Sequence, residues 1–315
     1  MVNCVPFILP HLAFLSCLPL DKREKQGYNK ITMKLCIDFG EPLEALGLEN
    51  AIKAIKAAGF DGIDFSFKDK IGKELLLDEN WDENAWRIRK ALDAGGLVCN
   101  QTHAPMDFSA ACKLCPKTPE MERIIRAFRF SQILGAKIVV VHAVTDVKPV
   151  DFIPYNLRFY KLLEPYAKAA NVKIAVENLF KFDAKSHRFE GVFETGEKLS
   201  SFVQKLRSSQ FVACVDTGHA ALTGTPPEKL IAGMNKSLVK CVHLHDNDGK
   251  DDLHLLPYSG VLDWDEILSS LKKIGYDGDI TFEIMFFLEK FSAEKMPIAL
   301  ALAGEVARKF KYKMA

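Results

Sequence analysis

The chain has 315 residues, of which 48% are hydrophobic and 26% are charged, so its composition is that of an ordinary globular protein with a substantial core. Its 42 basic and 41 acidic residues leave a formal net charge of +1. This balance excludes a global electrostatic attraction to nucleic acid or to an anionic membrane surface, although it leaves room for local patches.

The first 33 residues differ from the rest, because they carry no charge before Asp21 and are interrupted by prolines at positions 6, 10 and 19. A secretory signal normally starts with a basic region, which is missing here, and the prolines break the run too often for a membrane-spanning helix. We therefore expect residues 1–33 to be a non-conserved extension and residues 34–315 to form the folded domain. A cleaved signal or a membrane anchor is the alternative.

Short β-rich runs alternate with amphipathic helical patterns from Lys34 onward. The eight runs are KLCIDF (34–39), GIDF (62–65), LVCNQTH (97–103), KIVVVH (137–142), KIAVEN (173–178), FVACVD (211–216), LVKCVHLH (238–245) and DITFEI (279–284). Four cysteines lie inside these runs, where a thiol behaves as a small buried hydrophobic side chain. This favours a reducing, cytoplasmic location. The C-x-x-C of Cys112 and Cys115 lacks a second pair, so a structural or accidental origin is favoured over a redox or zinc-binding role.

Helical periodicity fills the segments between the runs, most clearly at residues 43–58 and 120–134. Thr225, followed by two prolines and a glutamate, is typical of a helix start, and Asp263 with Glu266 predicts a second capping box. The glycines expected near helix ends, where a left-handed C-cap favours glycine, are Gly59, Gly95, Gly135 and Gly275.

Strands that alternate with helices pair in parallel through right-handed crossovers, and eight such units in about 280 residues match a (β/α)8 TIM barrel of the α/β class. A doubly wound open sheet is the competing fold. Neither a G-x-G-x-x-G motif nor a Walker A motif follows an early run, so the usual reason to prefer the open sheet is missing. We expect a single barrel domain without a second domain or linker.

Side chains that can bind metals or move protons fall at or just after the ends of six successive runs, from the third to the eighth. In a TIM barrel these strand ends form one rim, where the chemistry takes place. These candidate site residues are His103, His142, Glu177, Asp216, His219, His243, His245, Asp252, His254 and Glu283.

Taken singly, each histidine is more typical of a hydrogen-bonded structural residue, and each aspartate of a helix cap or turn. Jointly, several carboxylates in one barrel mouth would repel one another without a cation. Glu177, Asp216, His243 and Glu283 offer three carboxylates and one imidazole, which suits Mn, Co, Mg or Zn with open coordination positions.

The motifs VEN (176–178), CVDTGHA (214–220), VHLHDNDG (242–249), DLHLLPYSG (252–260) and TFEI (281–284) resemble those of the xylose-isomerase-like TIM barrels. The superfamily includes sugar phosphate isomerases and epimerases, inosose dehydratases and endonuclease IV. Similarity to the ketose 3-epimerases implies that Glu177, Asp216, His243 and Glu283 bind one metal. It also implies that the two glutamates exchange a proton with the carbon next to a metal-bound carbonyl, and that His219 contacts the carbohydrate substrate.

The resemblance to endonuclease IV implies a different activity, the cleavage of abasic DNA with three zinc ions. Its additional ligands have candidates here in His103, His142, His219, Asp252 and His254. Against this, His245 and Asp248 replace the usual asparagine and serine after the seventh strand. The chain from Lys34 onward has a slight net negative charge, whereas a nuclease of this kind generally needs basic loops. A small carbohydrate is therefore favoured over nucleic acid.

Other hypotheses stay open at this point. An inosose dehydratase-like lyase shares the proton abstraction, and a non-catalytic sugar-binding barrel has no evident need for two glutamates at one centre. The loop at residues 181–191, with Lys181, Lys185, His187 and Arg188, is either a lid over the site or a solvated surface loop. We expect no membrane partner, and the chain could form a homo-oligomer.

Overall fold

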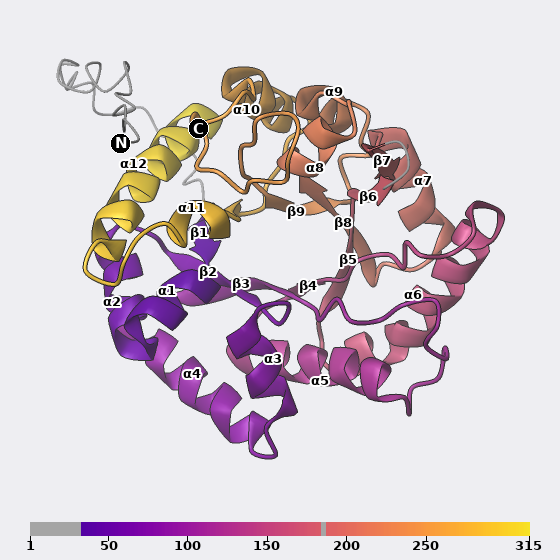
Figure 1. Ribbon diagram of the computed structural model, residues 1–315, viewed down its shortest axis with the longest axis horizontal. Coiled ribbons are helices and arrows are strands. Elements are labelled where there is room, and N and C mark those ends of the chain that lie inside the picture. The colour runs from indigo at the N-terminus through magenta and orange to yellow at the C-terminus, as the bar shows by residue number, and fades with distance from the viewer. Residues whose placement is uncertain (1–32, 184–186) are drawn as a thin grey trace, which may run out of the picture. The chain divides into compact units, whose positions relative to one another are not determined.

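The computed structural model describes residues 33–183 and 187–315 (Figure 1). Residues 1–32 lie outside the described part, so the predicted N-terminal extension and the division into domains stay predictions. Met33, the first described residue, is buried in the hydrophobic core. Residues 33–315 form one compact unit.

Eight parallel strands form the barrel, and each predicted run overlaps one of them. Their order around the barrel is β10-β1-β2-β3-β4-β5-β8-β9. A parallel bridge between Leu244 and Phe282 links the two outermost strands, and the Leu244 backbone N–H donates to Thr281 O at 2.9 Å. The predicted (β/α)8 fold is therefore confirmed. The strands are β1 (Leu35–Asp38), β2 (Gly62–Ser66), β3 (Val98–His103), β4 (Ile138–Val140), β5 (Lys173–Glu177), β8 (Phe211–Asp216), β9 (Val239–His243) and β10 (Ile280–Phe282).

Helices surround the strands in Figure 1 and cover their outer faces. They are α1 (Gly40–Leu46), α2 (Leu48–Ala57), α3 (Lys70–Leu77), α4 (Trp81–Gly95), α5 (Pro119–Leu134), η2 (Pro149–Asp151), α6 (Phe152–Ala169), α7 (Gly196–Lys205), α8 (Thr217–Leu222), α9 (Pro227–Ala232), α10 (Trp264–Lys273), α11 (Met285–Leu288) and α12 (Met296–Met314). None of these described helices is long and apolar enough to cross a membrane.

Most of the helix ends predicted from capping residues lie at or next to the observed ends. Asp263 caps α10 by accepting hydrogen bonds from the backbone N–H groups of Asp265 and Glu266. The single helix predicted at residues 43–58 is wrong, because Gly47 has φ of 74° and divides it into α1 and α2. Two predicted caps lie one residue away from the observed ones. The left-handed residue after α4 is Gly96 instead of Gly95, and the N-cap of α9 is Pro226 instead of Thr225.

The predicted lid or loop at residues 181–191 is mainly an antiparallel hairpin of β6 (Leu179–Asp183) and β7 (Arg188–Val192). Residues 184–186, including Lys185, lie outside the described residues. Lys181 stands opposite Glu190 in the hairpin register, and both residues line a cavity beside the hairpin. The alternation of apolar and polar residues in F-K-F and R-F-E-G-V is typical of strands and could have predicted this hairpin.

Two hydrophobic clusters form the core. The larger lies between the strands and the helices, and the smaller consists of Val140, Ala175, Val212, Cys214 and Cys241. Because side chains alternate along a strand, the face that carries Ala175, Cys214 and Cys241 also carries the residue two positions further on. Those residues are Glu177, Asp216 and His243, so the barrel itself brings the predicted ligands together.

Candidate metal and substrate site

The inner donor group consists of Glu177, Asp216, His243 and Glu283, from the ends of β5, β8 and β9 and the residue after β10. One ligand atom from each lies within 4.8 Å of the others. His243 Nδ1 is 2.6 Å from Glu177 Oε1, 3.5 Å from Glu283 Oε2 and 3.9 Å from Asp216 Oδ2. All four predicted ligands therefore surround one small volume.

Asp64 contacts the second imidazole nitrogen of His243 and supports the orientation of the ring. Its Nε2 atom is 3.3 Å from Asp64 Oδ2, and that same oxygen accepts a 2.8 Å hydrogen bond from Gln101 Nε2. A carboxylate on one imidazole nitrogen fixes the tautomer and directs the other nitrogen toward a metal. Asp216 has a second task, because its Oδ1 caps α8 by accepting from the His219 backbone N–H at 2.7 Å.

Electrostatic interactions favour the charged forms of Glu177, Glu283 and His243. Burial opposes ionisation of Glu177, but His243 and His142 hold its pKa well below the usual value. Burial likewise opposes ionisation of Glu283, while His243, Lys68 and His254 hold its pKa well below the usual value. The pKa of His243 is raised in spite of its burial, because Glu283, Glu177 and Asp64 favour the protonated ring.

The inner group fits a divalent cation. Its three carboxylates are 0 to 5% exposed, and burying several ionised carboxylates together is costly without positive charge. Three carboxylates and one imidazole are a common donor set for Mn, Mg, Co or Zn.

A second donor group combines His103, His142 and Glu177. His103 Nε2 lies 3.0 Å from His142 Nε2, and His142 Nε2 lies 2.8 Å from Glu177 Oε2. Burial, with Lys68 and His142 adding to it, holds the pKa of His103 well below its usual value. Neutral imidazole is the form that binds metals, so this group also has suitable chemistry.

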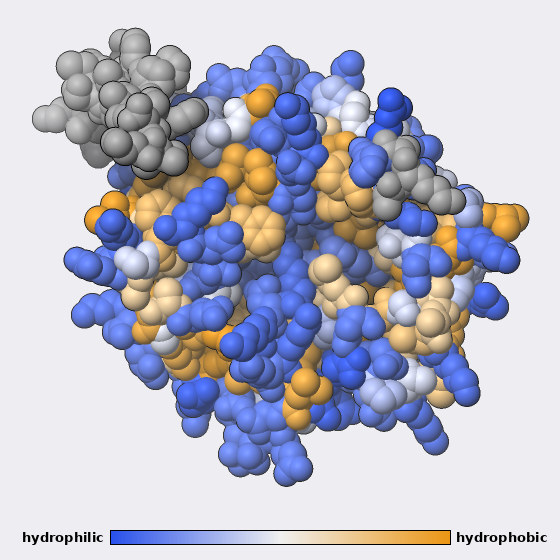
Figure 2. All heavy atoms as spheres, in the orientation of Figure 1, coloured by the Kyte–Doolittle hydropathy of each residue, from blue (hydrophilic) through white to orange (hydrophobic). Residues whose placement is uncertain are grey.

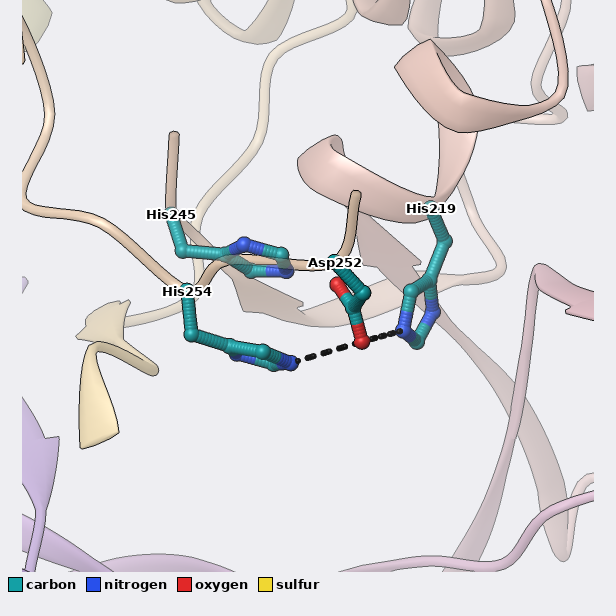
Figure 3. Close-up of side chains that lie close together, drawn as sticks. All are labelled: His219, His245, Asp252 and His254. Carbon is teal, nitrogen blue, oxygen red and sulfur yellow. Dashed lines mark hydrogen bonds and ion pairs between the residues drawn. The ribbon is translucent and has the colours of Figure 1, made fainter. Parts of the chain in front are cut away.

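The third donor group lies further out and consists of His219, His245, Asp252 and His254 (Figure 3). Asp252 Oδ2 is 3.1 Å from His254 Nε2 and 3.8 Å from His219 Nε2. The rings of His245 and His254 stack at 3.9 Å. His245 Nε2 binds Asp216 Oδ1 at 3.0 Å, which joins the third group to the inner one.

Two backbone features make this third group possible. The His245 ring lies against Gly218, where an added Cβ would come 2.0 Å from His245 Cε1, so the glycine of the D-x-G-H motif is needed for close approach. His254 has φ of 39°, a conformation that is uncommon for a side chain of this kind and often marks a functional position.

The third group also has polar atoms without partners. Asp252 Oδ1 and His245 Nδ1 are buried and have no hydrogen-bond partner among the described residues. Hydrogen bonding to His254 and the nearby histidines lower the pKa of Asp252 although burial raises it. Unsatisfied buried polar atoms of this kind are expected where an ion or a ligand completes the site.

Lys68 is a site residue that the sequence did not reveal. It follows β2, its Nζ is paired with Glu283 Oε1, and its side chain is 16% exposed. Its pKa is raised in spite of burial, mainly by Glu283. A lone lysine after a strand carries no motif, so only the barrel geometry places it beside Glu283.

A cavity of about 690 Å³ opens above the donor groups, and Figure 2 shows the hollow at the barrel mouth with apolar side chains along its border. The predicted residues that line it are His142, His219, Asp252, His254 and Glu283. All ten predicted site residues thus lie in or beneath one cavity. Cys112 and Cys115 belong to none of the donor groups found among the described residues, and both are free thiols.

The fold and the donor groups define a (β/α)8 barrel that carries side chains able to hold a metal ion at the carboxyl ends of its strands. The family model of the xylose isomerase-like TIM barrel matches residues 52–289. The chain therefore belongs to the xylose isomerase-like TIM barrel family, and the resemblance seen in its motifs is confirmed.

Characterised proteins of this kind are similar over most of the chain. D-psicose 3-epimerase of Enterocloster bolteae is 25% identical over 73% of this chain and 74% of its own length. The solved structure of a D-tagatose 3-epimerase-like protein superposes with a TM-score of 0.69 at 22% identity, covering 89% of this chain and 97% of its own. The zinc-bound IolI protein superposes with a TM-score of 0.66 at 18% identity, covering 88% and 99%.

Proposed function

We propose that the protein is a divalent-metal-dependent isomerase or epimerase of a small carbohydrate (a sugar, a sugar phosphate or a cyclitol). It would move a proton at the carbon next to a carbonyl. Glu177, Asp216, His243 and Glu283 would hold the cation, as the similarity to D-psicose 3-epimerase and to the zinc-bound IolI protein supports.

One observation carries this proposal: two glutamates, one at the end of β5 and one directly after β10, lie close to the same imidazole nitrogen. Glu177 Oε1 and Glu283 Oε2 lie 2.6 Å and 3.5 Å from His243 Nδ1. Each glutamate directs one oxygen to the donor group and keeps the other beside a proton donor, His142 for Glu177 and Lys68 for Glu283. Two such carboxylates suit proton removal on one side of a carbon and proton return on the other.

The residues have distinct tasks in this reaction. A bound divalent cation would polarise the carbonyl and hydroxyl oxygens of the substrate. Glu177 and Glu283 are both ionised at neutral pH, as their lowered pKa values require, so either can accept the carbon-bound proton. His219, at the wall of the cavity, is suited to hydrogen-bond a substrate hydroxyl.

Replacement of each glutamate tests the proposal. Glu177→Gln and Glu283→Gln keep the side-chain shape but remove the base, so we expect turnover of ketoses such as D-psicose to fall by roughly a thousandfold or more. The exposed Glu49→Gln on α2 is the matched control and should retain normal turnover. If either site variant stays near normal activity on a confirmed substrate, the two-glutamate mechanism is wrong.

A second candidate function, an endonuclease IV-like activity with three zinc ions, is favoured by the second and third donor groups. Lys68 is the one lysine or arginine among the described residues that line the cavity, which provides little positive charge for a DNA backbone. Elemental analysis of the purified protein separates the two functions, because about one metal per chain fits the isomerase and about three zincs fit the nuclease. Cleavage of a duplex with one abasic site would support the nuclease.

An inosose dehydratase-like lyase would use the same proton abstraction but lose water afterwards. Product analysis separates it from an isomerase, since the lyase product is lighter by one water. A homo-oligomer and a cytoplasmic location stay predictions, because a single described chain tests neither.

A further inference from the structure

We propose that the substrate is an uncharged glycoside whose apolar aglycone occupies a second cavity beside the donor groups. This inference rests on the proposed carbohydrate function and narrows its substrate class. It depends on three features: the charge of the main cavity, the apolar residues at its outer wall, and the position of the second cavity.

The main cavity is unsuited to an anionic substrate. Lys68 is the single lysine or arginine among its described lining residues, and its ammonium group is already paired with Glu283. Asp69, Asp146 and Asp252 line the same cavity. A phosphate or carboxylate group is normally held by arginine forks or by free backbone N–H groups. An uncharged sugar avoids the repulsion from these three carboxylates.

The outer wall of the main cavity is apolar. Met106, Phe180, Met285 and Phe286 line it, and Met106 and Phe286 remain 50% and 41% exposed. Exposed apolar side chains that gather at the mouth of a polar site indicate contact with an apolar group. A free monosaccharide offers little apolar surface, whereas an aglycone offers a full apolar face.

The second cavity, of about 540 Å³, lies between the start of α6, the β6–β7 hairpin and α7. Its apolar side is built from the aromatic residues Phe152, Phe193 and Phe202, and Phe193 lies 5.5 Å and 4.5 Å from the other two, measured between ring centroids. The other side carries three glutamates and three lysines, whose formal charges balance: Glu190, Glu194, Glu197, Lys181, Lys198 and Lys205. Glu194 and Lys198 pair with each other. A volume of this size with an aromatic wall and no net charge suits an uncharged small molecule.

The backbone conformation of Phe193 indicates that tight aromatic packing shapes the wall of this cavity. Phe193 has φ of 56°, in the left-handed region that favours glycine, and yet its side chain is 5% exposed between Phe152 and Phe202. A conformation of this kind costs energy and persists only where the surrounding contacts enforce it. The aromatic packing fixes the end of the hairpin against α6 and α7.

The two cavities are neighbours. Thr145 lines both of them, and the chain passes from one to the other between Asp146 and Val147 and again between Phe180 and Lys181. A ligand with its sugar ring over the donor groups can therefore extend past Thr145 into the second cavity. An elongated, uncharged glycoside has this shape.

The glycosidic bond has a chemical consequence. Since the anomeric carbon is blocked by the aglycone, the carbonyl required for proton transfer must stand at another ring carbon. The C–H bond next to it breaks and the proton passes to one ionised glutamate, which then releases it to solvent. A proton from solvent, relayed through the other glutamate, adds to the opposite face of the same carbon. The glycosidic bond stays intact, and no oxidant or reductant is consumed.

Binding of two probes tests the proposal without turnover. We expect metal-loaded protein to bind 4-nitrophenyl β-D-glucopyranoside about tenfold more tightly than methyl β-D-glucopyranoside, because the aromatic ring becomes buried. Glucose 6-phosphate should bind more weakly than either. Calorimetry measures all three. Tighter binding of the phosphate, or equal binding of the two glycosides, would overturn the proposal.

Two variants locate the aglycone. Ser201→Trp fills the second cavity from the exposed face of α7, and Gln204→Trp places the same side chain on α7 outside the lining. The first should remove the tenfold preference for the nitrophenyl glycoside, and the second should retain it. If Ser201→Trp fails to fold by circular dichroism, Phe152→Ala, which removes one aromatic wall, should reduce the same preference.

An unchanged preference in Ser201→Trp, or in Phe152→Ala where Ser201→Trp does not fold, contradicts the assigned cavity. The outcome is independent of the two-glutamate mechanism, because the probes carry no ring carbonyl and need only bind. Loss of the proposed reaction with retained probe preference would leave the binding site in place and remove the isomerase function alone.

Discussion

The lower and upper halves of the barrel interior have opposite chemistry although the same strands build both. The lower half is closed by Val140, Ala175, Val212, Cys214 and Cys241. Two residues further along three of these strands stand Glu177, Asp216 and His243. Two residues along β5, β8 and β9, the inward side chain thus changes from apolar to ionisable. We therefore expect substitutions in the lower half to alter stability and substitutions in the upper half to alter metal binding.

The largest effect is expected from His243→Ala in the upper half. This change removes the sole imidazole of the inner donor group, and we expect the affinity for Mn²⁺ or Zn²⁺ at that site to fall by more than about a hundredfold. Titration calorimetry measures the loss. Unchanged affinity would show that the inner group is not the metal site, and Cys241→Ala, two residues earlier, serves as the control with normal metal binding.

A smaller loss is expected from Asp64→Asn, which alters the support of His243 and leaves the four ligands in place. Removing a carboxylate that orients a ligating histidine typically costs about 10- to 100-fold in metal affinity. The same titration checks it. An effect as large as that of His243→Ala, or no effect at all, would contradict the assigned role of the Asp64 contact at 3.3 Å.

Val140→Ala tests the lower half. Val140 is fully buried, and loss of its two methyl groups should lower the free energy of unfolding by about 2 kcal/mol through lost burial and a residual cavity. Denaturant unfolding measures the change, and the metal stoichiometry should stay that of the unaltered protein. A loss of metal without a loss of stability would break the separation between the two halves.

Glu41, on α1, should give the smallest effect, and it depends on pH. Burial and the nearby Glu44, Glu289 and Asp69 raise its pKa from 4.5 to about 7. Between these values the folded state binds more protons than the unfolded state, so the free energy of unfolding falls as pH rises through this window. Glu41→Gln should therefore stabilise the protein above pH 7 and leave it unchanged below pH 4.5. Thermal unfolding at pH 4 and pH 8 checks this, and equal effects at both would contradict it.

The strands and the inner site were predictable from sequence because they follow strict physical rules. Parallel strands in a barrel end at one rim, so Glu177, Asp216 and His243 could be placed beside one another from their positions in three runs.

Other features could not be read from the chain, for identifiable reasons. Lys68 reaches Glu283 across the barrel, a contact between residues far apart in sequence. Gly47 interrupts a helix whose hydrophobic periodicity continues on both sides. The second cavity depends on Phe152, Phe193 and Phe202 from three separate elements, and no local pattern marks their approach.

Solvent deuterium exchange detects the proposed proton transfer itself. Metal-loaded protein is incubated in D₂O with D-psicose, other ketoses and ring-oxidised glycosides, and deuterium on the carbon next to the carbonyl is followed by NMR. The account predicts incorporation into at least one of these substrates that a chelator abolishes and that Glu177→Gln and Glu283→Gln lack. No incorporation into any of them, together with efficient cleavage of an abasic duplex, would contradict the account.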